Sequence, residues 1–132
     1  VRILLEPHGP VTDSIRGLQD VFDRLGNPDA LGVNLDTGNS WLGGADPVEM
    51  AKVFKEKIHH VHWKDLGPEW EAKRGTEFGC GFSMIALGDG VIDIKGVCDI
   101  LRDAGIASST LEIVGDAATL TRSKAYLEAC GV

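Results

Sequence analysis

Four side chains that can bind a divalent metal each stand at the end of a short apolar segment. They are Glu6 after Leu4-Leu5, Asp36 after Val33-Asn34-Leu35, His62 after His60-Val61 and Glu112 after Thr110-Leu111. Carboxylate oxygens and one imidazole nitrogen form a donor set that suits a divalent cation. The repeated placement predicts a shared metal site and therefore a metal-centred active site.

The apolar segments are predicted to be β-strands, each followed by a loop and a helix. The strands are expected at about 2–6, 31–36, 58–63 and 109–114, and the helices at about 14–25, 46–56, 94–104 and 117–129. Thr12 or Asp13 is expected to cap the first helix, and residues 37–44 are expected to form a loop. In a parallel βα repeat the carboxyl ends of all strands lie on one rim, which would bring the four side chains together.

This order predicts an α/β fold, (βα)4, that is half of a (β/α)8 barrel or a small open sheet. Ligand-type residues follow all four strands, which favours the barrel, because an open doubly wound sheet has its ligand site at one switch point. Residues 65–92 are too many for an ordinary βα loop and are expected to form a lid. Val1 is not a methionine and a strand follows at once, so we expect the C-terminal part of a longer chain.

The formal net charge of −7 argues against a nucleic-acid partner, because nucleic-acid surfaces need clustered Lys and Arg. No apolar run approaches the roughly 18–20 residues that cross a bilayer, so no membrane partner is expected. The three cysteines show no C-x-x-C spacing, which argues against a structural zinc or disulfide framework and indicates a cytoplasmic location. Cys80, between two glycines, is expected to be more exposed than Cys98 and Cys130.

Five motifs resemble the xylose isomerase-like TIM barrel superfamily, which includes sugar and sugar-phosphate isomerases and epimerases, inosose dehydratases and apurinic endonucleases. The motifs are Leu5-Glu6-Pro7-His8-Gly9, Leu35-Asp36-Thr37-Gly38-Asn39, His60-Val61-His62-Trp63-Lys64-Asp65, Leu87-Gly88-Asp89-Gly90-Val91-Ile92-Asp93 and Leu111-Glu112. The resemblance implies one domain over residues 1–132, equivalent to strands five to eight, the C-terminal half of such a barrel.

The resemblance also implies a metal and a reaction. The implied ligands are Glu6, Asp36, His62 and Glu112, around Mn²⁺ first, with Co²⁺, Mg²⁺ or Zn²⁺ as alternatives. In such enzymes the metal polarises a carbonyl while a carboxylate removes the proton on the neighbouring carbon, a role that Glu6 and Glu112 would take here. The implied function is a metal-dependent isomerase, epimerase, dehydratase or lyase of carbohydrate metabolism, acting on a sugar or cyclitol carbonyl compound.

Three positions depart from the pattern of the ketose 3-epimerases. Asn39, Thr12 and Pro68 replace a substrate-binding His, a second Glu and an Arg, which argues against a typical member of that branch. The apurinic endonucleases also carry a His at the position of Asn39, so a nuclease is the weaker alternative.

Polar residues just past the rim resemble those of dehydratases and lyases instead. His8 would act as a general acid or bind a substrate hydroxyl, Lys64 would neutralise developing oxyanion charge, and Asp65 follows it.

The competing hypothesis is a non-enzymatic half barrel that serves as a structural or interaction module. Four parallel strands alone leave two open edges, so we expect a homo-oligomer or pairing with an N-terminal half barrel.

Overall fold

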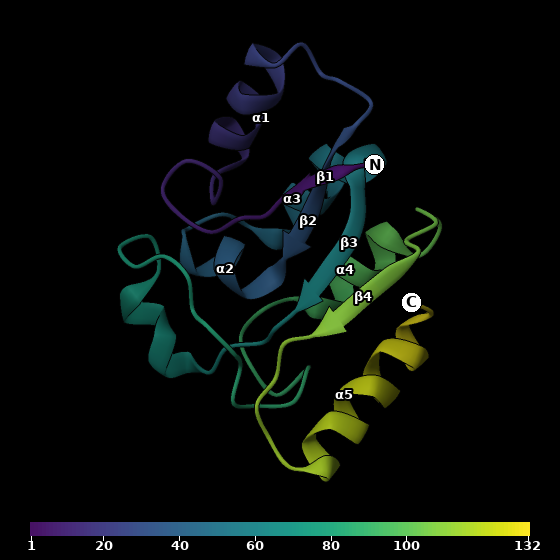
Figure 1. Cartoon of the computed structure of the whole chain (residues 1–132). Coiled ribbons are helices and arrows are strands. Elements are labelled where there is room, and N and C mark those ends of the chain that lie inside the picture. Colours follow the sequence, from purple (N-terminus) through teal and green to yellow (C-terminus); the bar gives the residue numbers. More distant parts are fainter.

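The computed structural model describes residues 1–132 as one parallel sheet with associated helices (Figure 1). The strands are β1 (Ile3–Leu5), β2 (Leu31–Asp36), β3 (Ile58–Trp63) and β4 (Ser108–Leu111), in the order β1-β2-β3-β4. The helices are α1 (Ile15–Arg24), α2 (Thr37–Leu42), α3 (Pro47–Phe54), α4 (Ile94–Leu101) and α5 (Ala117–Cys130), with 3-10 turns at Lys55–Lys57 and Pro68–Lys73. Strands adjacent in sequence are adjacent in the sheet, so the predicted α/β, (βα)4 fold is confirmed.

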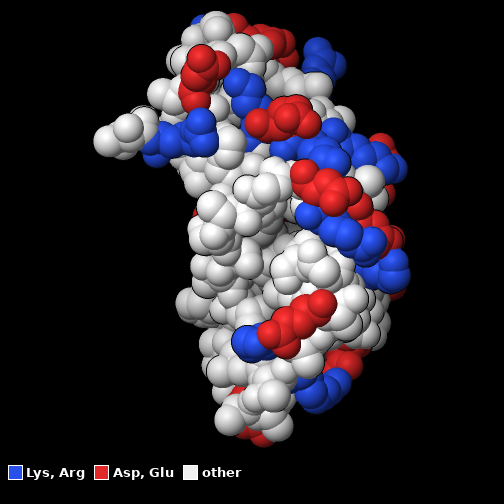
Figure 2. Space-filling view, turned by 90° about the vertical axis from the view of Figure 1, so that its right-hand side faces the viewer, with Lys and Arg blue, Asp and Glu red and all other residues white.

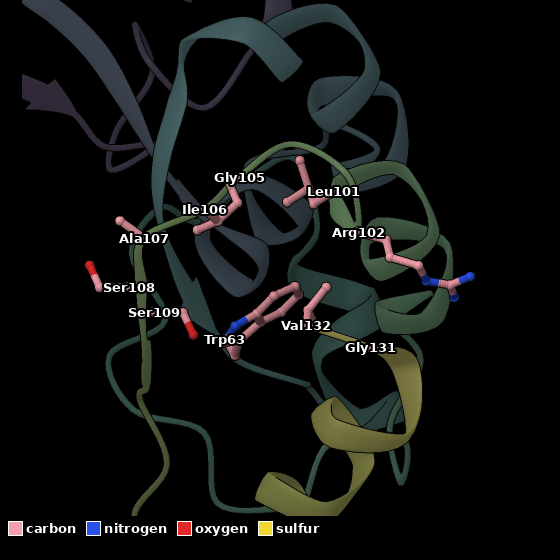
Figure 3. Close-up of a pocket in the computed structure, with 10 residues that line it drawn as sticks. All are labelled: Trp63, Leu101, Arg102, Gly105, Ile106, Ala107, Ser108, Ser109, Gly131 and Val132. Carbon is pink, nitrogen blue, oxygen red and sulfur yellow. The ribbon is translucent and has the colours of Figure 1, made fainter.

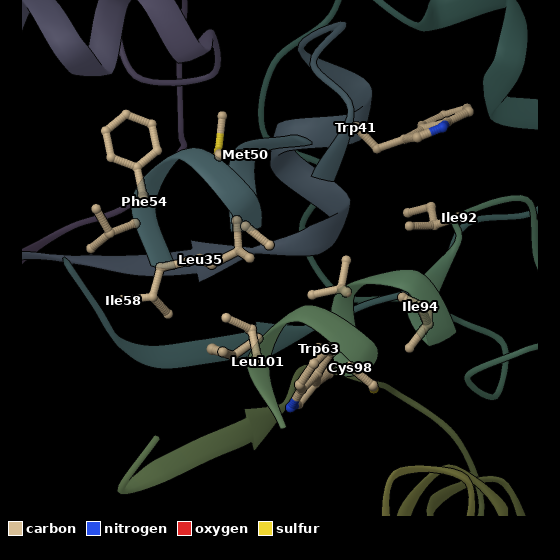
Figure 4. Close-up of a cluster of buried hydrophobic side chains, with 14 of the residues drawn as sticks. Leu35, Trp41, Met50, Phe54, Ile58, Trp63, Ile92, Ile94, Cys98 and Leu101 are labelled. Carbon is tan, nitrogen blue, oxygen red and sulfur yellow. The ribbon is translucent and has the colours of Figure 1, made fainter. Parts of the chain in front are cut away.

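The main hydrophobic core lies between the strands and helices α3 and α4 (Figure 4). Its members are apolar side chains from the two central strands and the facing helix surfaces, including Leu35, Ile58, Trp63, Met50, Phe54, Cys98 and Leu101. Every one of these side chains is at least nine-tenths buried. This packing fixes β2 and β3 against the helices and leaves the other face of the two strands free to carry polar side chains.

A β-bulge sets which face of β3 carries its histidines. Val33 pairs with Ile58, but the next residue of β2, Asn34, pairs with His60, so β3 holds one extra residue at this point. Ile58 therefore packs in the core, whereas His60 and His62 lie beside Asn34 and Asp36 on the opposite face. Without the extra residue, strict alternation would place Ile58 on the same face as the histidines.

Two local predictions were wrong. The loop expected at 37–44 contains helix α2, because the Asp36 carboxylate caps it by accepting from Asn39 N at 2.8 Å. The first helix is capped by Ser14, whose hydroxyl accepts from Gly17 N at 3.0 Å, and not by Thr12 or Asp13. The Thr12 hydroxyl instead accepts from His8 N at 3.0 Å, within the turn that precedes the helix.

The long segment between β3 and α4 is fixed by one buried carboxylate. Asp65 accepts four backbone N–H groups at 2.9–3.1 Å, from Leu66, Gly88, Gly90 and Ile92. Ser83 N also donates to Glu112 O at 2.9 Å and Val114 N donates to Ser83 O at 2.8 Å, so Ser83 pairs with the residues that follow β4. Asp65 thus holds the backbone here, and the lid function expected for residues 65–92 stays a prediction.

Replacing Asp65 with Ala should lower the free energy of unfolding by about 3 kcal/mol or more, because buried N–H donors would lose their acceptor. Asp65→Asn, which keeps one carbonyl oxygen, should lose less. Urea unfolding followed by circular dichroism measures both values. An Asp65→Ala variant as stable as the unchanged chain would show that the carboxylate is dispensable.

In Figure 2, charged side chains of both signs alternate along the top and the right-hand side of the molecule, while the left and centre of this face are mostly uncharged. Ion pairs between neighbouring side chains account for several of the chain's surface charges, including Lys95–Asp99, Arg102–Asp99 and Arg122–Asp89. The helices are all too short or too polar to span a membrane.

Candidate metal centre

Three of the four predicted ligands meet at the carboxyl ends of the first three strands. Glu6 directly follows β1, Asp36 ends β2, and His62 is the penultimate residue of β3. One ligand atom of each lies within 4.8 Å of the other two. His62 Nδ1 is 3.5 Å from Glu6 Oε2 and 3.7 Å from Asp36 Oδ2. The parallel register thus brings together residues that are 26 to 56 positions apart.

The two oxygens of Asp36 have different roles. Oδ1 accepts from Asn39 N and begins helix α2, so it fixes the orientation of the carboxylate. Oδ2 is then directed toward His62 on the inner face of the sheet, and the whole residue is buried. The first turn of the helix therefore positions one oxygen of the predicted metal ligand.

The buried polar atoms of this cluster fit a bound cation. Asp36 Oδ2 and His62 Nδ1 are both buried and lack a hydrogen-bond partner. Buried polar atoms without hydrogen-bond partners are uncommon. Asp36 Oδ2 has the Lys64 ammonium at 2.9 Å as an ion-pair partner, and His62 Nδ1 lies 3.2–3.7 Å from carboxylate oxygens of Glu6, Asp36 and Glu112. A divalent ion shared by a carboxylate oxygen and an imidazole nitrogen would satisfy both atoms, and the donor set suits such an ion.

Lys64 and Glu112 border the three ligands. Lys64 Nζ lies 2.7 Å from Glu112 Oε2, and 2.9 Å from Asp36 Oδ2 in an ion pair without hydrogen-bond alignment. Glu112 Oε1 is 3.2 Å from His62 Nδ1, so the fourth predicted ligand adjoins the group without joining it. Burial alone would lower the pKa of Lys64, but the carboxylates of Asp36 and Glu112 outweigh it and raise that pKa. Lys64 is therefore a fixed positive charge in the site.

Asn34 is a site residue that the sequence reasoning missed. Its side-chain nitrogen donates to Glu6 Oε2 at 2.9 Å and lies 3.2 Å from His62 Nε2. An amide nitrogen only donates, so Asn34 fixes the Glu6 carboxylate and lies against the ring of His62 without accepting a proton from it. The available signal was its spacing, since Asn34 stands two residues before Asp36 and shares its face of the strand.

His8 lies at the edge of the cluster. Its ring is largely exposed, with Nδ1 3.1 Å from Asn39 Nδ2 and 3.8 Å from Glu6 Oε1. It therefore stands beside a predicted ligand and within reach of a molecule that enters from solvent, and its expected acid role stays a prediction.

Metal affinity should fall as the pH is lowered from 8.5 to 6. The carboxylate of Asp36, followed by those of Glu112 and Glu6, raises the pKa of His62 above 6.5 against the effect of burial. Protons therefore compete for the ring at higher pH than for an ordinary histidine, and a metal needs the unprotonated nitrogen. Calorimetric titration with Mn²⁺ at several pH values measures this dependence. An affinity that is constant over this range would exclude His62 as a ligand.

A separate cavity of about 330 Å³ lies between the start of β4 and the C-terminal ends of α4 and α5 (Figure 3). Trp63, Leu101 and Val132 are among the side chains that line it, together with Arg102 and Ser109. Its lining contains no carboxylate, histidine or cysteine. The cavity therefore offers no side-chain ligand set for a metal, unlike the group of Glu6, Asp36 and His62 at the rim.

Comparisons with known proteins agree with this fold. Residues 1–130 match the model of the xylose isomerase-like TIM barrel family, and the chain belongs to this family. The chain is 29% identical over 85 residues to an inosose dehydratase of Lacticaseibacillus casei, covering 60% of this chain and 28% of that protein. It is 26% identical over 112 residues to a 3-dehydroshikimate dehydratase of Bacillus anthracis, covering 76% and 38%.

Solved structures show the same fold. A crystal structure of a probable 3-DHS dehydratase from Bacillus anthracis superposes with a TM-score of 0.71 at 23% identity, over 98% of this chain and 48% of that one. A D-tagatose 3-epimerase-like protein gives 0.69 at 19% identity, over 98% and 46%. The chain spans about half the length of these structures, and the resemblance to the barrel family is confirmed.

Proposed function

We propose that this chain carries the metal site of a divalent-metal-dependent enzyme that removes a proton beside the carbonyl of a sugar or cyclitol. The observation that carries the proposal is the rim cluster of Glu6, Asp36 and His62, with two buried ligand atoms that lack hydrogen-bond partners. The inosose and 3-dehydroshikimate dehydratases among the relatives support elimination of water as the reaction. Isomerisation or epimerisation is the second candidate, which the family and the epimerase-like structural neighbour support.

Glu6, Asp36 and His62 would hold the ion, with Glu112 beside them. Mn²⁺ is the first expectation, and Co²⁺, Mg²⁺ and Zn²⁺ also suit these donors. When bound, the ion would polarise the substrate carbonyl and so acidify the neighbouring C–H bond. The positive charge of Lys64, held by the carboxylates of Asp36 and Glu112, would add to the stabilisation of negative charge in the site.

In the proposed elimination, a carboxylate oxygen of Glu6 takes the proton from the carbon next to the carbonyl. The electron pair of that C–H bond forms a C=C bond to the next carbon, and the C–O bond of the hydroxyl on that carbon breaks. His8 supplies the proton with which the hydroxyl leaves as water. Atoms and charge balance without a redox partner. In an epimerisation, Glu112 would instead return a proton to the first carbon from its other face.

The direct assay uses inosose and 3-dehydroshikimate as substrates with metal-loaded protein. Elimination conjugates a new C=C bond with the carbonyl, so product formation is followed by ultraviolet absorbance and confirmed by the loss of one water in mass spectrometry. Exchange of the substrate proton for solvent deuterium without loss of water would favour the epimerase alternative. Absence of both reactions with these and other ketoses would contradict the proposal. The expected pairing with a second copy or with an N-terminal half barrel stays a prediction.

A further inference from the structure

Asn39 makes polar contacts from both ends of its side-chain amide. Its Oδ1 accepts from Cys80 N at 3.0 Å and from Cys80 Sγ at 3.2 Å. Its Nδ2 donates to Glu6 Oε1 at 3.3 Å and lies 3.1 Å from His8 Nδ1. The residue is buried in helix α2, between the metal centre and the segment at 75–82. One side chain thus contacts two predicted catalytic residues and a distant part of the chain.

The partners leave one orientation of the amide. A backbone N–H can only donate, so the oxygen of Asn39 faces Cys80. The amino group must then face Glu6 and His8, so Nδ1 of the His8 ring is an acceptor and the proton that His8 can give lies on Nε2. The backbone position of Cys80 therefore determines, through Asn39, which groups Glu6 and His8 meet.

The segment at 75–82 lies directly on helix α2 and on His8. Gly75 N donates to Leu42 O at 2.6 Å, which attaches the start of the segment to the end of the helix. A Cβ on Gly38 would approach Cys80 Sγ to 2.9 Å, so only glycine allows this contact. A Cβ on Gly79, whose φ is +76°, would lie 3.0 Å from His8 Nε2. The close approach requires small residues on both sides.

Cys80 is buried, as Cys98 and Cys130 are, which corrects the expectation that it is more exposed than they are. Burial raises the pKa of its thiol to about 11, so at neutral pH the thiol is protonated and can donate to Asn39. Accessibility of Cys80 therefore reports whether the segment is seated on Asn39.

We propose that Asn39 is a positioning residue that couples the seating of the segment at 75–82 to the orientation of Glu6 and His8. The coupling to catalysis rests on the proposed function, because it assumes that Glu6 and His8 move protons. The seating itself is independent of that function and is measured separately.

Two variants separate the two ends of the amide. Asn39→Ala removes both, whereas Asn39→Asp keeps an acceptor for Cys80 N–H and loses the donor to Glu6 and His8. Ser40→Ala is the matched control, because the Ser40 hydroxyl bonds the backbone of Asp36 in the same helix without contacting Cys80. Alkylation by iodoacetamide, mapped by peptide mass spectrometry, reads out Cys80, with buried Cys98 and Cys130 as internal references.

Asn39→Ala should raise the alkylation rate of Cys80 at least about tenfold, because it removes the acceptor of both Cys80 N and Cys80 Sγ, with the other cysteines unchanged. Asn39→Asp and Ser40→Ala should leave Cys80 within about threefold of the unchanged chain. Asn39→Asp should lower kcat about tenfold or more, with KM little changed. These results support the coupling, and the cysteine result stands even if no substrate is found.

Three results would overturn it. Cys80 labelling that Asn39→Ala does not change would show that Asn39 does not seat the segment. A rise at all three cysteines would make Asn39 a general stabiliser of the fold. Turnover by Asn39→Asp equal to that of the unchanged protein would remove the link to Glu6 and His8, whereas absence of turnover in the unchanged protein would count against the proposed function alone.

Discussion

Replacement of Glu6 by Gln is expected to lower kcat by at least about a thousandfold, within the range that general acid–base groups supply. Gln has nearly the same size, and its one oxygen can still accept the hydrogen bond that Asn34 donates, while the longer bond from Asn39 Nδ2 at 3.3 Å is lost. It removes the negative charge and the ability to take up a proton, so the chemistry should fail while the fold persists. Steady-state kinetics at saturating metal measures the loss.

One further variant and one control accompany the Glu6 experiment. Glu112→Gln should also lose turnover if the second glutamate serves the site, whereas Glu128→Gln, on the exposed side of α5, should not. Circular dichroism should be unchanged in all three variants. Turnover by Glu6→Gln within about tenfold of the unchanged protein would rule out Glu6 as the base.

Replacement of Asp36 by Asn is expected to weaken metal binding by more than about a hundredfold. Asn is among the best residues for capping a helix, so the bond from Asn39 N and the start of α2 should be retained. The charge on Oδ2, which faces His62, is lost. Loss of an outer-sphere partner typically costs 10–100-fold in metal affinity, and loss of a direct ligand should cost more.

Calorimetry with Mn²⁺ on the unchanged and variant proteins measures the effect of Asp36→Asn. Asp46→Asn, at the cap of α3, is the matched control, because it makes the same substitution at a helix start away from the rim. Equal affinity in Asp36→Asn and Asp46→Asn would show that the metal is bound elsewhere.

Much of the strand framework could be predicted because the relevant interactions are local. Apolar runs such as 31–36 and 58–63 form the strands expected, and the end of a strand is a position that sequence alone marks. Parallel order then places Glu6, Asp36 and His62 on one rim by geometry. The confirmed fold and the meeting of these three residues follow from that reasoning.

The missed features depend on contacts between segments far apart in the chain. Helix α2 was expected as a loop because its Gly, Asn and Ser residues favour turns, and the Asp36 cap and packing of Trp41 and Leu42 override that preference. Burial of Cys80 depends on Asn39, 41 positions earlier. The ion pair from Lys64 to Asp36 likewise requires the folded sheet.

The most direct test of the metal-dependent proton abstraction is turnover before and after removal of the metal. The protein is treated with a chelator, assayed with inosose, 3-dehydroshikimate and ketoses, and assayed again after addition of Mn²⁺ or Co²⁺. The account predicts that turnover disappears with the metal and returns with about one ion per chain. Turnover that stays near its original value in metal-free protein would contradict it.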